Sequence, residues 1–200
     1  ARTLYLLIEP DDAAVDRLLF ERDPGGYRTS LLAGSWRPFD WAFVCARGLC
    51  YALADHVRSS AVAREGGEHA GVARTIARDT AVHVVHWREW ITTMVSSGEA
   101  ARVQPVLAEL VEMTGEFFSE RDWRGETDTM LEQWSSDLNA ACAQAGLTIP
   151  AVAPSDLRAA AGTLRERGLA GREGRHDAAF RALVAEAASV YRAYPGATLA

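Results

Sequence analysis

The sequence contains no lysine, so all 21 of its basic residues are arginine. Lysine-dependent phosphate binding of the Walker type, Schiff-base chemistry and a lysine general base are therefore excluded within this chain. Acidic residues number 27, which gives a formal net charge of −6 at pH 7. Because an acidic surface repels phosphate backbones, the composition predicts that nucleic acid is not a partner.

Cysteine is scarce and long hydrophobic runs are missing. Cys45, Cys50 and Cys142 are odd in number and form no CxxC motif, which is typical of small buried residues in a reducing cytoplasm. The longest apolar run is interrupted by Arg47 and Gly48 and is shorter than the roughly 20 residues that cross a bilayer. No secretory signal is visible at the start of the sequence. We therefore predict a cytoplasmic protein without a membrane partner.

Helical periodicity, in contrast, is abundant. Apolar residues recur at spacings of three and four in two long segments, about 39–65 and 69–97, which are separated by Gly66 and Gly67. Such spacing is typical of amphipathic helices, and a glycine turn between two of them predicts an antiparallel hairpin. The flanks of the first segment are apolar too, so we expect it to be the buried centre of the protein.

The remaining segments predict a single all-α domain over residues 1–200, a bundle of six to seven helices around this hairpin. Residues 3–8 are rich in strand formers and are closed by Pro10, which favours a short N-terminal strand. Residues 147–154 form a proline-containing connector to the C-terminal helices. A lone strand needs a partner, so a homodimer or partner contact through this N-terminal segment is also expected.

The second long segment carries the most suggestive chemical groups. At about 100° per residue, Asp79, His83 and His86 fall within an arc of roughly 60° on a helix. Two imidazoles and a carboxylate suit acid–base catalysis, with Asp79 orienting His83, and they also occur as metal ligands. A histidine on an apolar stripe is more commonly a hydrogen-bonded core residue. The favoured hypothesis is acid–base catalysis by His83, His86 and Asp79, with no metal ligands assigned and the cofactor unknown.

A hairpin that turns at Gly66 and Gly67 places Cys50 opposite His83 and His56 near the level of Asp79. His56 and Cys50 are therefore predicted to contribute to the same site. Trp41, Trp87 and Trp90 belong to the same hairpin and could either fill the core or line a cavity for a flat apolar ligand. These five residues are the predicted ligand-binding set.

Two further patterns bear on function. The paired Glu-x-x-His motifs of di-iron bundles are missing, since the one such spacing, Glu173 to His176, lies in a glycine-rich loop. In that loop Arg172 and Arg175 could clamp a carboxylate or phosphate, although a surface connector is the commoner meaning of such a segment.

Two functional hypotheses follow. The first is a small helical enzyme of bacterial specialised metabolism, which acts on an apolar or aromatic small molecule. The second is a non-catalytic module that binds a ligand or a protein.

Overall fold

The computed structural model describes residues 11–34, 37, 40–118, 127–149 and 153–194. Eight α-helices lie within these residues, and the only β-type pairing among them is an isolated bridge between Ala170 and Arg175. The all-α prediction is confirmed. The strand predicted at residues 3–8 lies outside the described residues.

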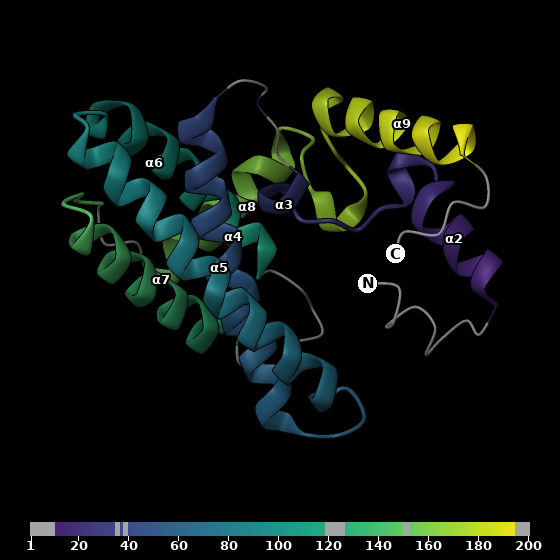
Figure 1. Ribbon diagram of the computed structural model, residues 1–200, viewed down its shortest axis with the longest axis horizontal. Coiled ribbons are helices and arrows are strands. Elements are labelled where there is room, and N and C mark those ends of the chain that lie inside the picture. The colour runs from purple at the N-terminus through teal and green to yellow at the C-terminus, as the bar shows by residue number, and fades with distance from the viewer. Residues whose placement is uncertain (1–10, 35–36, 38–39, 119–126, 150–152, 195–200) are drawn as a thin grey trace.

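Figure 1 shows how the helices are arranged. In chain order the elements are α2 (Asp12–Phe20), η1 (Pro24–Gly26), α3 (Leu31–Gly34), α4 (Trp41–Glu65), α5 (Ala70–Ser96), α6 (Ala100–Phe117), α7 (Thr127–Gln144), α8 (Pro154–Glu166), η2 (Gly171–Glu173) and α9 (Ala178–Ala193). With the short helix α3, the described residues contain one α-helix more than the six to seven that the sequence predicts.

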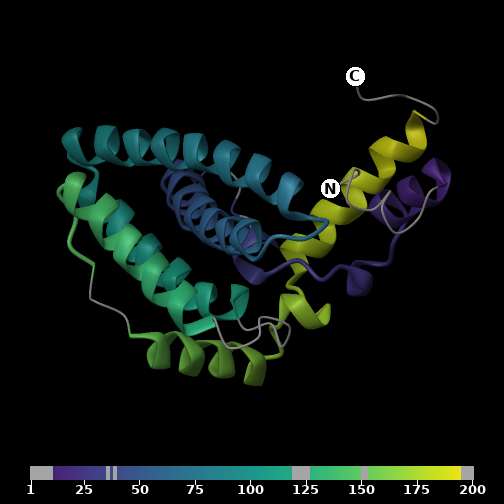
Figure 2. The same cartoon turned by 90° about the horizontal axis from the view of Figure 1, so that it is seen from below.

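Helices α4 and α5 form the predicted hairpin. The carboxylate of Asp40 accepts a hydrogen bond from the Phe43 amide and so caps the start of α4. The helix ends at Gly66, and both Gly66 and Gly67 have φ values of 81°, in the region that favours glycine. Figure 2 shows α5 as the outermost helix on its side of the molecule, with α4 beneath it.

The core surrounds α4, which packs against α5, α6 and α7. Trp134 of α7 is fully buried, and its indole Nε1 donates a hydrogen bond to the Cys50 carbonyl at 3.1 Å. Helix α8 covers α6 from the other side. The central role predicted for the first long segment is therefore confirmed.

Helices α2 and α9 pack against each other beside this bundle (Figure 1). Phe20 and Tyr191 stack with ring centroids 4.7 Å apart. His176, which precedes α9, is buried, and its Nε2 lies 3.1 Å from the Tyr27 carbonyl oxygen. These contacts fix the segment around η1 against the end of the bundle, where α4 and α6 also meet.

The described helices include none that has both the length and the apolar character needed to cross a membrane. All three cysteines are buried and carry no disulfide.

Candidate functional site

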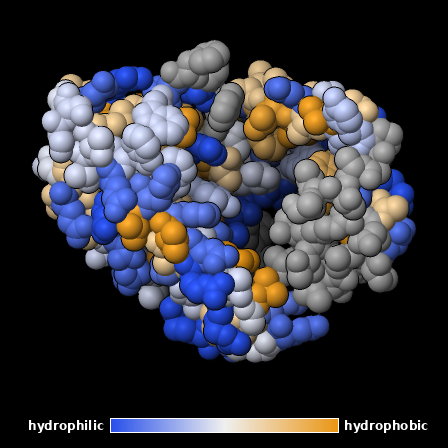
Figure 3. Space-filling model, in the orientation of Figure 1, coloured by the Kyte–Doolittle hydropathy of each residue, from blue (hydrophilic) through white to orange (hydrophobic). Residues whose placement is uncertain are grey.

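The predicted acid–base residues lie on the outer surface of α5. Asp79, His83 and His86 are all exposed, and the Asp79 carboxylate accepts hydrogen bonds of 3.4 Å from Arg78. In the space-filling view, the face that α5 forms is mainly hydrophilic, with a small hydrophobic group at its middle (Figure 3). The three side chains thus share one face, as predicted, but that face points away from the core.

The predicted tryptophans also gather near this surface. Trp41 and Trp90 contact each other edge to face, with ring centroids 5.3 Å apart, and they are 44% and 40% exposed. The His86 ring lies 6.5 Å from that of Trp90 and 4.9 Å from that of Trp87. Trp87 is partly buried because its indole lies directly on Gly48, where a Cβ atom would overlap the ring. The cluster is therefore a surface group of aromatic rings.

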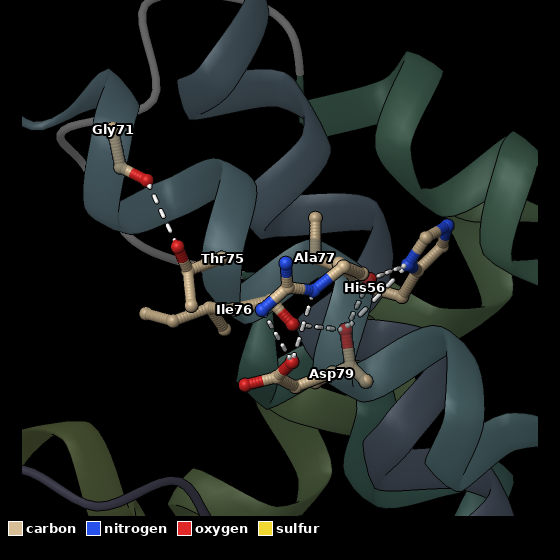
Figure 4. A network of polar contacts seen from close by, with 8 residues as sticks. His56, Gly71, Thr75, Ile76, Ala77 and Asp79 are labelled. Atoms are coloured by element: carbon tan, nitrogen blue, oxygen red, sulfur yellow. Dashed lines mark hydrogen bonds and ion pairs between the residues drawn. The ribbon is translucent and has the colours of Figure 1, made fainter.

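Cys50 and His56 do not join these residues. Cys50 is fully buried in the core, and burial raises the pKa of its thiol. The His56 Nδ1 donates a hydrogen bond to the Ala77 carbonyl at 2.8 Å. Figure 4 shows that the His56 ring and the Asp79 carboxylate point in different directions. The convergence of Asp79, His83, His86, Cys50 and His56 on one site is not found.

The register of the hairpin is nevertheless as predicted, because His56 contacts Ala77 and Gly48 contacts Trp87. The rotation of α5 about its own axis is different. Its inner face is formed by Ala73, Thr80, Ile91 and Met94, with Val84 and Trp87 partly buried between them. The helical spacing of residues 69–97 predicts His83 and Trp90 on one apolar stripe that faces the core, but both are exposed.

A different site emerges where η1, α4, α6 and η2 meet. A cavity of about 340 Å³ opens there, within the range that small ligands occupy. We call it the arginine pocket, because four arginines line it. Its lining consists of Arg22, Tyr27, Arg28, Thr29, Ser30, Ala33, Tyr51, Arg58, Phe117 and Arg172.

Two of these guanidinium groups are placed over the same aromatic ring. The Cζ atoms of Arg58 and Arg172 lie 5.1 Å and 5.2 Å from the centroid of Phe117, which is almost completely buried. Attraction between a cation and the face of an aromatic ring favours both positions. Tyr51 packs edge to face against Phe117 at 6.0 Å. Side chains distant in the sequence thus form one positively charged, aromatic wall.

One of the four arginines has its charge balanced by a carboxylate outside the lining of the pocket. Arg58 forms an ion pair of 3.0 Å with Asp55, which is itself buried. Among the described residues that line the pocket, none is acidic. Burial, followed by the charge of Asp55, raises the pKa of the Tyr51 phenol. Tyr51 therefore stays neutral at physiological pH, where it can donate a hydrogen bond and adds no negative charge.

The buried side chain of Glu116 connects two segments that line the pocket, α3 and η2. Its Oε2 accepts a hydrogen bond from the Leu31 amide and its Oε1 accepts one from the Arg172 amide, both at 2.8 Å. The residue is 4% exposed, and its burial raises the pKa of the carboxyl group. Because its two partners lie on α3 and η2, this one side chain positions both segments against α6.

We expect Glu116→Leu to lower the free energy of unfolding by about 2–4 kcal/mol, since two buried amides lose their acceptors. A carboxyl group with a raised pKa stabilises the fold most at low pH, and that contribution is lost as the pH rises through the raised value. The gap between wild type and variant should therefore narrow as the pH rises above about 4.3, the ordinary pKa of a glutamate. Urea unfolding of both proteins at a series of pH values measures this difference in free energy. A difference that widens as the pH rises would contradict the raised pKa of Glu116.

Metal binding was not assigned from the sequence. Within the described ranges, no three histidine, cysteine, aspartate or glutamate side chains lie close enough together to hold a metal ion.

Sequence reasoning found only one member of the arginine pocket. Arg172 was named as part of a candidate anion clamp, and it does line the pocket. Its predicted partner Arg175 instead pairs with Glu173 at 2.6 Å. Arg22, Arg28 and Arg58 carry no local signal, because each is one arginine among many and only the fold brings them together.

Comparison with known proteins adds the family. No curated protein sequence matches the chain significantly. Residues 1–198, nearly the whole chain, match the family described as phenylacetic acid catabolic protein. A match of this extent agrees with the predicted helical protein that handles an aromatic small molecule, at the level of metabolism of aromatic compounds. The chain belongs to the phenylacetic acid catabolic protein family.

Proposed function

We propose that this chain is a ligand-binding protein of aromatic-acid catabolism and that the arginine pocket takes an aromatic carboxylate of the phenylacetate type. The observation that carries the proposal is the pair of guanidinium groups, Arg58 and Arg172, held over Phe117 at the pocket wall. The name of the family supplies the ligand class, an aromatic ring that bears a carboxylate.

The chemistry of the pocket fits both halves of such a ligand. Guanidinium groups bind carboxylates through charge-assisted and often paired hydrogen bonds. The rings of Tyr27 and Tyr51 offer apolar faces for the ligand ring, and the hydroxyls of Thr29 and Ser30 add polar groups at the same wall. The pocket is large enough for one aromatic ring with a short acidic side chain.

Calorimetric titration with phenylacetate and with phenylacetamide tests this proposal. The two compounds share the ring, and only phenylacetate is charged. We expect phenylacetate to bind at least about tenfold more tightly, with an affinity that falls as salt concentration rises, because exposed charges are screened. Equal binding of both compounds would contradict the role of the arginines. Equally tight binding of inorganic phosphate would contradict the role of the aromatic rings.

Catalysis by His83 and His86, with Asp79 as the orienting group, stays a prediction. The surface cluster of Trp41, Trp90 and His86 is the observation in its favour. If that cluster takes the ligand, His83→Ala and His86→Ala should weaken phenylacetate binding while Arg172→Ala leaves it unchanged. The arginine pocket predicts the opposite order. A cytoplasmic, bacterial setting belongs to the same proposal, and the three unpaired cysteines support a reducing compartment.

A further inference from the structure

The outer side of α5 carries a line of exposed residues that no described element covers. Starting at Gly71, the line advances by alternating steps of four and three residues, which is the spacing of a coiled-coil seam. We call it the α5 seam. It comprises Gly71, Thr75, Arg78, Val82, Val85, Glu89, Thr92 and Ser96, of which all but the partly buried Thr92 are exposed.

The middle of the α5 seam is apolar. Val82 and Val85 are 65% and 42% exposed, high values for hydrophobic side chains. Trp90, on the same helix, is also exposed. Figure 3 shows the small hydrophobic group on this face among hydrophilic residues. A patch of this kind on a helix is typical of an interaction surface.

The two charged residues of the α5 seam lie on opposite sides of the valines. Arg78 precedes Val82 by four residues, and Glu89 follows Val85 by four residues. If a second α5 packs antiparallel, with Val82 of one helix opposite Val85 of the other, then Arg78 faces Glu89 of the second copy. The same alignment places Thr75 opposite Thr92 and Gly71 opposite Ser96. Every pair occurs twice, as a two-fold axis requires.

From this self-complementary order of charges, we infer that the α5 seam binds a second copy of this chain in an antiparallel helix pair. A parallel pair would place Arg78 against Arg78 and Glu89 against Glu89, and like charges in contact oppose association. The small residues at both ends of the seam let the two helices approach closely. This contact is separate from the N-terminal segment that was predicted to mediate dimerisation, and from the arginine pocket.

Charge reversal on the full-length chain tests the inference. Sedimentation velocity from micromolar to millimolar concentration should show a monomer–dimer equilibrium. Arg78→Glu and Glu89→Arg should each raise the dissociation constant of the dimer by about tenfold or more, because each places two like-charged pairs in the contact. The double variant Arg78→Glu/Glu89→Arg should restore it. Arg181→Glu, at an exposed position of α9, is the matched control and should leave it unchanged.

Cross-linking gives the orientation. The three native cysteines are buried, so single cysteines at Thr75 and Thr92 report on the seam. A mixture of Thr75→Cys and Thr92→Cys chains should form a disulfide-linked dimer on oxidation, whereas Thr75→Cys alone should not. A wild type that stays monomeric at millimolar concentration, a double variant that does not recover, or efficient cross-linking of Thr75→Cys alone would each overturn the inference.

Discussion

Arg172→Ala is expected to weaken phenylacetate binding by one to two orders of magnitude, because a charge-assisted hydrogen bond to a ligand contributes about 1.5–3 kcal/mol. The Arg172 guanidinium lies 5.2 Å from Phe117 at the pocket wall. Its backbone amide, rather than its side chain, donates to Glu116. The substitution therefore removes the ligand-binding group and the 3.2 Å hydrogen bond from its Nη1 to the Arg28 carbonyl, and keeps the amide contact with Glu116 that positions η2.

The same experiment on Arg58 should give a mixed result. Arg58 is the ion-pair partner of the buried Asp55, so Arg58→Ala leaves a buried carboxylate without its cation. We expect weaker binding together with a lower free energy of unfolding, by about 1–3 kcal/mol. Calorimetric titration and urea unfolding separate the two effects.

The control for both variants is Arg74→Ala. Arg74 is exposed on α5, which contributes no residue to the described lining of the pocket. Arg74→Ala changes the net charge by the same amount as Arg58→Ala or Arg172→Ala. It should leave phenylacetate affinity within about twofold of wild type, since a distant exposed charge is screened. If Arg74→Ala and Arg172→Ala weakened binding equally, the weaker binding would come from the change in net charge and would contradict a specific role for Arg172.

A large loss of stability is also expected from Gly115→Ala, at the crossing of α6 and α8. A Cβ atom on Gly115 would overlap the backbone carbonyl of Leu157, and a backbone atom cannot move aside as a flexible side chain can. Overpacking of this kind costs about 3 kcal/mol, a large part of the 5–15 kcal/mol that stabilises a typical domain. Thermal unfolding should show a markedly lower midpoint for this variant.

Gly162→Ala is the matched control for that prediction. Gly162 lies in α8, and no heavy atom lies within 4 Å of the position that its Cβ would take. Alanine is favoured over glycine in a helix by about 1 kcal/mol, so this variant should be slightly more stable than wild type.

Gly115→Ala should also weaken phenylacetate binding, because Glu116 and Phe117 directly follow it on α6. A stable Gly115→Ala protein would contradict the close α6–α8 contact.

The helices could be predicted from the sequence because their signals are local. Apolar spacing marked α4 and α5, and Gly66 and Gly67 marked the turn, where both residues have φ values of 81°. The rotation of α5 could not be predicted. Val82 and Val85 lie on its exposed side, so apolar residues surround much of the helix and periodicity does not identify the inner face.

The arginine pocket could not be predicted for a different reason. Arg22 and Arg172 are far apart in the sequence and line the same pocket because α9 packs against η1 while η2 packs against α3 and α6. Because every basic residue of the chain is arginine, the residue type alone does not predict which arginines lie close together in the folded protein. Arg172 was noticed only because neighbouring glycines drew attention to its loop.

A crystal structure of the protein soaked with phenylacetate tests the central claim most directly. The ligand carboxylate is predicted to lie within hydrogen-bond distance of the guanidinium groups of Arg58 and Arg172, with its ring against Tyr51. Phenylacetate bound beside His83 and His86 on α5, with the arginine pocket empty, would contradict the account.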